Sequence, residues 1–206
     1  MKSVMSTRGK FFAGFFAMVF STALMADVLQ GATWVKEGVN WAQYTKFQVK
    51  PLDVSDVNVI KPPYAADDTS DWTVDFKDLE GMQAIFRDVM TDVLEANDGY
   101  PVVYNDGKDV LEVKVEILSI MPWLKPGGGD EFDGFEVQTL GSGEITAHVE
   151  LRDSETREAL MLFEGDKAVG EQYQQFTRAN NVSNITAMFT QFANRLRGSM
   201  DRVHGK

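Results

Sequence analysis

Two stretches of alternating side chains decide the predicted fold: VLEVKVEI at residues 110–117 and EITAHVELR at residues 144–152. In each of them, apolar residues occupy every second position, and polar or charged residues fill most of the positions between. Because a β-strand points successive side chains to opposite faces, this pattern is typical of a strand with one buried and one solvated face. The two stretches therefore predict the centre of a sheet that keeps one polar face.

Weaker signals add strands on either side of this centre. The alternating run 46–52 predicts one strand, residues 102–103 predict a short one before the hairpin signal Asn-Asp-Gly at 105–107, and residues 159–169 predict another. Residues 153–157 are interpreted as a turn in which Asp and Ser side chains bond to nearby backbone. Since strands joined by short turns pair antiparallel, we expect an antiparallel sheet of about four to five strands.

Two longer segments have the period of an amphipathic helix. The first begins after Asp75, a good N-cap residue, and repeats apolar side chains at steps of three and four from Phe76 to Leu94. It ends at Asn-Asp-Gly 97–99, where the glycine suits a left-handed position. The second spans residues 182–203. A helix with one apolar face must bury that face, so we expect an α+β fold with both helices packed on one face of the sheet.

The N-terminal segment, residues 1–26, has the features of a signal peptide. Three basic residues, Lys2, Arg8 and Lys10, precede the apolar run FFAGFFAMVFSTALMA at residues 11–26. This run is shorter than the roughly 20 apolar residues that a spanning helix needs. We therefore expect export to the periplasm, with no membrane span after cleavage; the alternative is an uncleaved anchor in the inner membrane.

The rest of the chain divides into an N-terminal lead-in, residues 27–43, and a single α+β domain, residues 44–206. Trp34 and Trp41 lie seven positions apart in the lead-in, and we interpret them as attaching it to the domain surface. The chain shows no internal repeat and no second core.

Composition excludes several classes of function. With 20 Lys and Arg against 31 Asp and Glu, the net charge is −11, which gives no electrostatic footprint for nucleic acid. The absence of cysteine excludes a thiol nucleophile, a cysteine-ligated zinc site, an iron–sulfur cluster and a lipid anchor on an N-terminal cysteine. No cofactor is expected.

A long loop, PWLKPGGGDEFDGFE at residues 122–136, is the best candidate for a binding site, because long loops on rigid scaffolds often carry function. Its oxygen-rich, glycine-containing part at 127–136 suits a hard cation such as calcium, although the spacing does not match an EF-hand loop. The metal-ligand candidates are its four carboxylates, Asp130, Glu131, Asp133 and Glu136. The alternative is a solvated loop between two strands.

The same loop carries three aromatic residues, Trp123, Phe132 and Phe135, which are the candidates for binding a partner. Phe132 and Phe135 either present a partner-binding tip or pack back onto the sheet.

No catalytic constellation is recognisable. Of the two histidines, His148 is expected on the outward face of a strand beside Glu150, and His204 in a frayed C-terminus. No serine lies in a G-x-S-x-G context. The acidic residues could still supply a carboxylate pair, whose members are brought together in space rather than in sequence.

Several short fragments together resemble a family of Gram-negative envelope lipoproteins that is known only as a domain of unknown function. The matching pieces are Trp34 with Gly38, Tyr44-x-x-Phe47-x-Val49-x-Pro51, Asp92–Leu94, the strand 110–117, and Asp153-Ser154-Glu155-Thr156 ahead of Glu158-Ala159-Leu160. The resemblance implies interaction work rather than catalysis, although this chain lacks the lipid-modified cysteine of most members.

These observations predict an exported envelope protein that acts as a non-enzymatic interaction or assembly module. Its partner would be another envelope protein or a second copy of the chain. Two alternatives remain: a periplasmic hydrolase that uses carboxylates, and a protein that binds calcium or a small ligand through residues 127–136.

Overall fold

The structure, a computed structural model, describes residues 32–126 and 137–206. In chain order its elements are β1 (Ala32–Val35), η1 (Trp41–Gln43), β2 (Lys46–Val49), β3 (Asn58–Val59), η2 (Pro63–Ala65), α2 (Phe76–Glu95), β4 (Val110–Pro122), β5 (Gln138–Leu140), β6 (Gly143–Asp153), β7 (Ala159–Val169), β8 (Tyr173–Gln175) and α3 (Arg178–His204).

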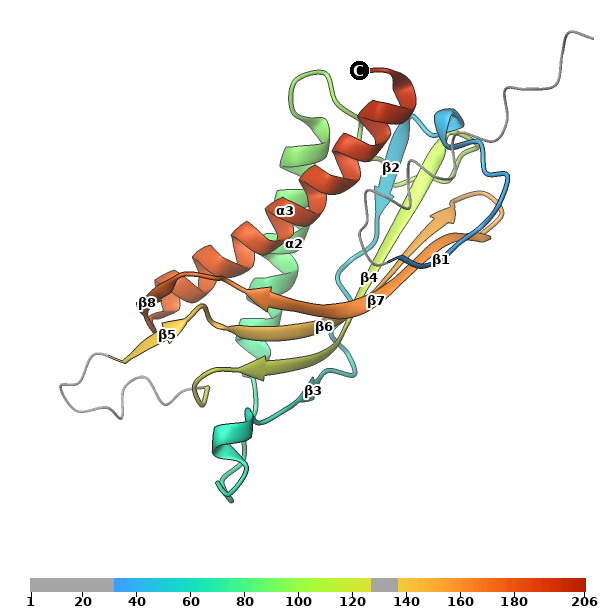
Figure 1. Cartoon of the computed structure of the whole chain (residues 1–206). Helices are drawn as coiled ribbons and strands as arrows, with labels where there is room; N and C mark the ends of the chain where they lie inside the picture. Colours follow the sequence, from blue (N-terminus) through green and yellow to red (C-terminus); the bar gives the residue numbers. More distant parts are fainter. Residues whose placement is uncertain (1–31, 127–136) are drawn as a thin grey trace, which may run out of the picture.

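The main sheet has six strands in the order β1-β7-β6-β4-β2, and β3 also pairs with β4 (Figure 1). The pairs along β1, β7, β6 and β4 are antiparallel, whereas β2 and β3 both run parallel to β4. The prediction of a purely antiparallel sheet of four to five strands is therefore wrong. The reason is that α2 lies between β3 and β4 in the chain, and such a crossover brings the chain back in the same direction.

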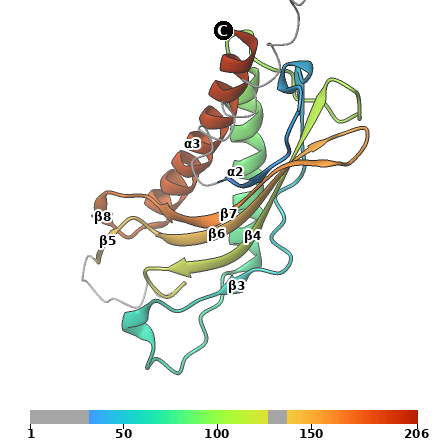
Figure 2. The same cartoon turned by 45° about the vertical axis from the view of Figure 1, so that its right-hand side comes forward.

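Both helices cover one face of the sheet, as predicted, and leave the other face open (Figure 2). They run side by side in the same direction. Arg178 Nη2 lies 3.3 Å from Asp78 Oδ1 near their N-terminal ends, and the Phe86 and Phe189 rings meet edge to face at 5.1 Å farther along. The core lies between this helix pair and the sheet, and the fold class is α+β.

The first helix begins as the sequence predicts, because the Asp75 side chain accepts a hydrogen bond from the Lys77 backbone N–H. Its end differs from the prediction. The left-handed residues are Asn97 and Asp98, not Gly99. Gly99 is required for another reason, since a Cβ there would lie 2.1 Å from the backbone oxygen of Leu94.

The segment expected to be a lead-in contributes directly to the domain. Its residues 32–35 form β1, the edge strand beside β7, and Trp34 stays partly exposed there. Trp41 is fully buried and packs near Tyr44 with ring centroids 6.3 Å apart. Trp41 is thus enclosed in the core rather than attached to the surface.

The predicted short strand and hairpin near residue 105 do not form. Val102 makes only an isolated parallel bridge to Phe47. Gly107 instead binds the turn between β6 and β7: its N–H donates to Ser154 Oγ, and that hydroxyl donates to the Gly107 carbonyl, both at 3.0 Å. The turn itself is confirmed, because Asp153 Oδ1 accepts from the backbone N–H of Glu155 and Thr156.

The predicted loop 122–136 begins at the last residue of strand β4. Strand β4 continues to Pro122 and stays paired with β6 as far as Gly143. A shift in register between Ile117 and Ser119 breaks the alternation, so the sequence pattern ends five residues before the strand does. Beyond the sheet, β5 and β8 form a separate two-stranded ribbon.

Candidate functional site

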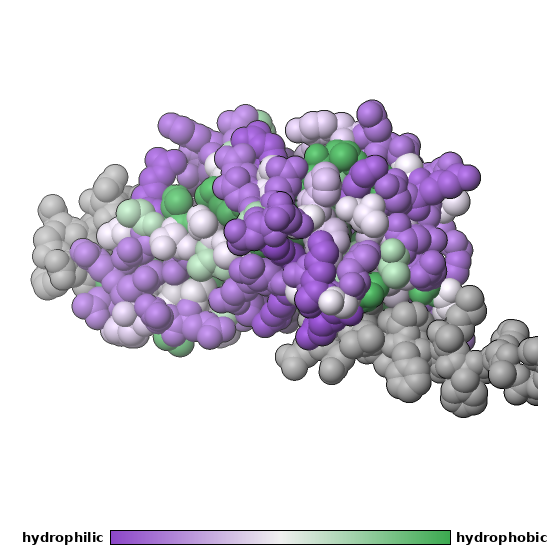
Figure 3. Space-filling model, turned by 90° about the horizontal axis from the view of Figure 1, so that it is seen from above, coloured by the Kyte–Doolittle hydropathy of each residue, from purple (hydrophilic) through white to green (hydrophobic). Residues whose placement is uncertain are grey.

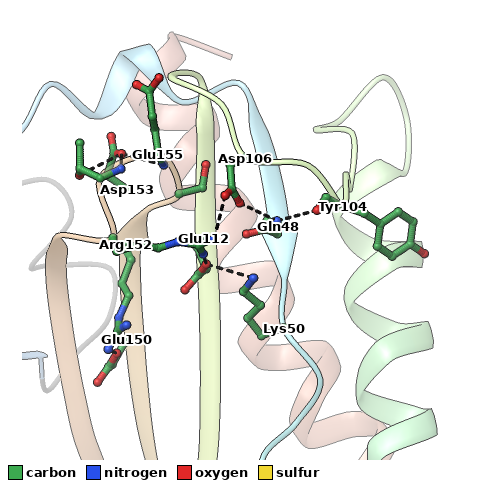
Figure 4. A network of polar contacts seen from close by, with 12 residues as sticks. Gln48, Lys50, Tyr104, Asp106, Glu112, Glu150, Arg152, Asp153 and Glu155 are labelled. Atoms are coloured by element: carbon green, nitrogen blue, oxygen red, sulfur yellow. Dashed lines mark hydrogen bonds and ion pairs between the residues drawn. The ribbon is translucent and has the colours of Figure 1, made fainter.

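One end of the open sheet face carries a network of charged side chains (Figure 4). Glu112, only 3% exposed, lies at its centre on β4. Its carboxylate is 3.2 Å from Lys50 Nζ and also forms an ion pair with Arg157, which reaches Asp106 at 2.7 Å. A buried carboxylate with two cationic partners is neutralised, and this network joins the end of β2, β4 and the β6–β7 turn.

The same network secures the segment after α2. Gln48 is buried, and its Nε2 donates to the Tyr104 carbonyl at 2.7 Å and to Asp106 Oδ1 at 3.1 Å. The ring of Tyr104 points away from the sheet and is 91% exposed (Figure 4).

His148 lies on the open face, as predicted. Its Nε2 is 3.1 Å from Glu150 Oε1, and its Nδ1 is 3.5 Å from Glu164 Oε2. Burial raises the pKa of Glu150, but the hydrogen bond to His148 and the charge of Arg152 outweigh that effect and hold the pKa below its ordinary value.

The second histidine is placed differently from the prediction. His204 is not frayed: its Nδ1 lies 2.8 Å from the Met200 carbonyl oxygen and its Nε2 lies 3.2 Å from that of Ala42. The Tyr100 hydroxyl is 3.3 Å from the same Nδ1. These contacts attach the end of α3 to the segment that carries Trp41.

Several described carboxyl groups have a shifted pKa. Each described carboxyl with a resolved shift has a lowered pKa, which favours the charged form. These groups are Asp53, Asp68, Asp109, Glu150 and Asp153. Hydrogen bonds explain several of these shifts, as when Ser70 and Trp72 donate to Asp68. No group of three metal-ligating side chains occurs among the residues that the structure describes.

A groove of about 870 Å³ opens at one end of the molecule, between the first halves of α2 and α3 and the ends of β4, β6 and β7. Four buried core residues contribute to its lining: Met82, Ile120, Ile145 and Val169. Ile85 of α2 and Ile185 of α3 line it as well. The volume falls within the range of about 300–1,000 Å³ that is typical of ligand pockets.

Gly81 gives the groove additional room on the α2 side. It lies inside the first half of the helix, lines the groove, and would place an added Cβ where no atom lies within 4 Å. Glycine inside a helix costs about 0.5–1 kcal/mol relative to alanine. The packing around Gly81 therefore does not require glycine, whereas the width of the groove depends on it.

Polar contacts fix the α3 side of the groove. The Ser142 hydroxyl donates to Asn181 Oδ1 at 2.7 Å and accepts from Asn184 Nδ2 at 2.8 Å. The neighbouring Gly141 has φ +72°, and a Cβ there would lie 2.2 Å from the Gly170 carbonyl oxygen. The start of α3 is thereby held against the start of β6.

Exposed apolar side chains occur on several of the segments that form or adjoin the groove. The described part of the chain has eight large exposed hydrophobic residues, and five of them belong to these segments. One lines the groove, three lie within two residues of a lining residue in the sequence, and one bonds to the backbone of Trp123. The five are Tyr64, Phe76, Leu140, Tyr173 and Val182. Seen from above, the molecule is mostly hydrophilic, and hydrophobic residues appear only as small separate patches (Figure 3). The groove, with its volume and its largely apolar lining, is the best candidate site.

The sequence-predicted site residues are only partly described. Trp123 is half-buried, and its neighbours Pro122 and Leu124 line the groove. Its backbone N–H donates to the Ser142 carbonyl at 3.2 Å, and its backbone carbonyl accepts from the Tyr64 hydroxyl. The other candidates lie outside the described residues: Asp130, Glu131, Phe132, Asp133, Phe135 and Glu136.

Sequence reasoning missed the groove itself, because its lining comes from separate parts of the chain. One signal was available. Phe76 and Val182 open the apolar patterns of the two predicted helices, yet they are 72% and 44% exposed. Apolar residues at the starts of both helices are consistent with a contact surface at that end.

The fold defines the chain as an α+β domain with two parallel helices on a mixed sheet. A family model described as a protein of unknown function, DUF3313, matches residues 25–196. The chain belongs to this family, which confirms the resemblance drawn from its short fragments. A comparison with curated proteins finds no match.

The solved structures that are similar to this chain include the following two. A Xanthomonas campestris protein assigned to DUF330 is 11% identical, with 78% of this chain and 88% of that one covered and a TM-score of 0.44. The PelC dodecamer from Paraburkholderia phytofirmans is 8% identical, with 75% and 89% covered and a TM-score of 0.35. Neither likeness bears on the function of this chain.

Proposed function

We propose that this protein is an exported envelope protein whose domain acts as a non-enzymatic interaction or assembly module. The observation that carries the proposal is the apolar groove with exposed hydrophobic side chains around it. Exposed apolar surface gathered at one place is typical of an interaction site, whereas single exposed hydrophobic residues need no explanation.

The energetics favour a macromolecular partner. Burying an exposed Val or Phe side chain contributes about 1.5–3 kcal/mol, and Val182 together with Phe76 leaves much apolar surface available. A small ligand enclosed in the groove would not cover Leu140 or Tyr173, which lie on the β5–β8 ribbon next to it. A partner protein can cover the groove and the ribbon together.

The envelope location rests on the N-terminal sequence. Three basic residues followed by the apolar run 11–26 support export, since this is the composition of a signal peptide. No helix among residues 32–126 and 137–206 is long and apolar enough to cross a membrane.

The groove supports interaction better than the hydrolase alternative. Its lining contains two carboxylates, Asp78 and Glu144, and Asp78 is already paired with Arg178 at 3.3 Å. The calcium alternative depends on carboxylates that lie outside the described residues, so no described geometry favours it.

Site-specific photocrosslinking in intact cells tests the proposal. A photoreactive phenylalanine analogue at Val182, which lines the groove, should give a discrete crosslinked band in the envelope fraction. The same analogue at Tyr104, which is highly exposed in the charged network away from the groove, serves as the control and should give none. Equal crosslinking at both positions, or none at Val182, would contradict the proposal.

A further inference from the structure

The outer edge of β7 is only partly covered. This strand runs from Ala159 to Val169, but β1 pairs with it only at residues 161–163. Among residues 32–126 and 137–206, no strand pairs with this edge at residues 164–169 (Figure 1). The uncovered edge of a strand is a template on which another extended chain can pair.

The register shows which backbone groups face this edge. Residues 161–169 pair with β6 without any shift in register. The Glu164 N–H points to the β1 side, where it donates to Thr33 Oγ1 at 3.1 Å. Because backbone groups alternate between the two sides of a strand, Asp166 and Ala168 also direct their N–H and C=O groups outward. All three of these β7 residues are exposed.

The side chains beside these outward backbone groups are acidic. On the open face of the sheet, Glu164 lies 3.5 Å from His148, and Asp166 accepts a hydrogen bond from Thr146 at 2.7 Å. Neither carboxylate has a Lys or Arg partner in the described part of the chain. The next cation along the strand, Lys167, points to the opposite face, because side chains alternate.

We infer that this edge binds an extended segment of another protein, which adds a strand to β7 and carries Lys or Arg at two positions two residues apart. Side chains two residues apart in a strand share a face. One cation then lies opposite Glu164 and the other opposite Asp166, and opposite charges across a strand pair stabilise the pairing. Backbone hydrogen bonds supply the affinity in this mode of recognition, and the side chains supply the specificity.

This inference rests on the proposed function, since it names the kind of segment that a protein partner presents. It concerns a surface that adjoins the groove: Val169, the last residue of β7, belongs to the groove lining. The acidic side chains of the edge are Glu164 and Asp166, which do not line the groove.

Charge argues against two other occupants of the edge. A second copy of the chain has a net charge of −11, and pairing two β7 edges would bring the acidic residues of one copy beside those of the other. The residues before β1, DVLQG at 27–31, contain no Lys or Arg. A partner segment with two cations on one face matches both the backbone and the charge of the edge.

Two eight-residue peptides of the same composition test the spacing of the cations. Each contains five Thr, one Val and two Lys. The Lys residues occupy the third and fifth positions in one peptide, and the third and sixth in the other, where a strand would point them to opposite faces. Binding to the protein purified from the envelope fraction is followed by fluorescence anisotropy. We expect the third-and-fifth peptide to bind about tenfold more tightly, and added salt to reduce its affinity.

Amide hydrogen exchange, measured by NMR spectroscopy, locates the bound peptide. The amides of Asp166 and Ala168 should exchange at least about tenfold more slowly with the peptide bound, because each then donates to a neighbouring strand. The amide of Lys167 is the internal control. It faces β6, as the alternation requires, so its exchange should change little.

Variants separate the backbone contribution from the charge. Ala168→Pro removes one outward N–H, a change that edge strands tolerate, and should abolish binding, whereas Ala168→Thr keeps the N–H and should bind normally. Glu164→Gln together with Asp166→Asn should lower the affinity for the third-and-fifth peptide to that for the third-and-sixth. The exchange measurement uses the unmodified protein, so it decides the question even where Ala168→Pro does not fold.

Three outcomes would overturn the inference. Equal affinity for the two peptides would show general charge attraction in place of strand pairing. Slow exchange at Asp166 and Ala168 before any peptide is added would show an edge that is already covered. A second copy covers it if the slow exchange disappears on dilution, and the chain's own N-terminal segment covers it if the slow exchange persists. Failure of both peptides to bind would likewise count against the edge, but not against the groove, which crosslinking at Val182 tests separately.

Discussion

Arg197 of α3 donates a hydrogen bond from Nη1 to the backbone carbonyl oxygen of Val93 in α2, at 2.9 Å. Val93 lies in the last turn of its helix, whose final carbonyls have no partner within the helix. A cation at this end is also favoured by the helix dipole. One helix therefore caps the other, and this contact is possible because the two helices run in the same direction.

This contact gives the first prediction. Replacement of Arg197 by Met should lower the free energy of unfolding by about 1–2 kcal/mol, because the Val93 carbonyl loses its charged donor. Urea unfolding measures the change. Arg195→Met is the control, since Arg195 is an exposed residue on the same helix and should have little effect. Equal losses for the two variants would show that general charge, and not the cap, is responsible.

The second prediction compares two phenylalanines of α2. Phe86→Ala should cost about 3–5 kcal/mol, because the ring is fully buried and meets Phe189 edge to face. Phe76→Ala at the exposed start of the same helix should change stability by less than about 0.5 kcal/mol. Thermal unfolding of both variants checks this. A large loss at Phe76 would mean that its side chain is covered within the monomer.

The third prediction concerns two glycines. Gly81→Ala should stabilise the protein by about 0.5–1 kcal/mol, because alanine favours the helix and its Cβ meets no atom. Gly99→Ala should destabilise it, because the new Cβ would lie 2.1 Å from the Leu94 carbonyl oxygen. Guanidinium melts of the pair should therefore move in opposite directions, and a loss of stability for Gly81→Ala would contradict the open space on α2.

The fourth prediction concerns acid. Burial raises the pKa of Asp153, but hydrogen bonds from Thr156 and Tyr44 outweigh it and hold the pKa below the ordinary value of 3.8. A lowered folded-state pKa stabilises the protein above the unfolded value, and this contribution is lost as the pH falls through the folded one. Stability should therefore fall below about pH 4, and Asp153→Asn should flatten that dependence.

Denaturant unfolding between pH 2 and pH 6 would measure the effect at Asp153. Glu155→Gln, in the same turn, is the control, since the Asp153 carboxylate and not the Glu155 side chain accepts the bonds of the turn. An unchanged acid dependence in Asp153→Asn would show that other carboxylates dominate acid unfolding.

The sequence predicted the local features of the fold well. The cap at Asp75, the turn at Asp153 and the two helices on one face all follow from short patterns, and the structure contains them. Such features depend on neighbours within a few residues, so a single sequence is enough to reveal them.

Long-range pairing was harder to predict. Whether β2 runs parallel or antiparallel to β4 depends on the path of the chain through α2, and no side-chain pattern records that path. The bulge after Ile117 also interrupts the alternation of apolar and polar residues, so the sequence pattern does not extend to the end of β4. The direction of β2 relative to β4 and the length of β4 were therefore not predicted correctly, although both strands were identified.

The candidate site could not be predicted because its lining is assembled from distant segments. Gly81, Ile145 and Ile185 have nothing in common in the sequence, and each reads as an ordinary helix or strand position. Of the predicted partner-binding residues, Trp123 belongs to the described part of the chain, and its neighbours line the groove.

The position of β1 beside β7 has a consequence for the order of events during synthesis. Ala32 pairs with Phe163 and Val35 with Met161, so the first strand finds its partner only near the end of the chain. A ribosome releases residues 32–35 long before residues 161–163 exist. Until then the strand has unpaired backbone groups and an exposed Trp34, which are features that invite association with other chains. In a nascent chain, β1 therefore cannot take its native place in the sheet until residues 161–163 have been made.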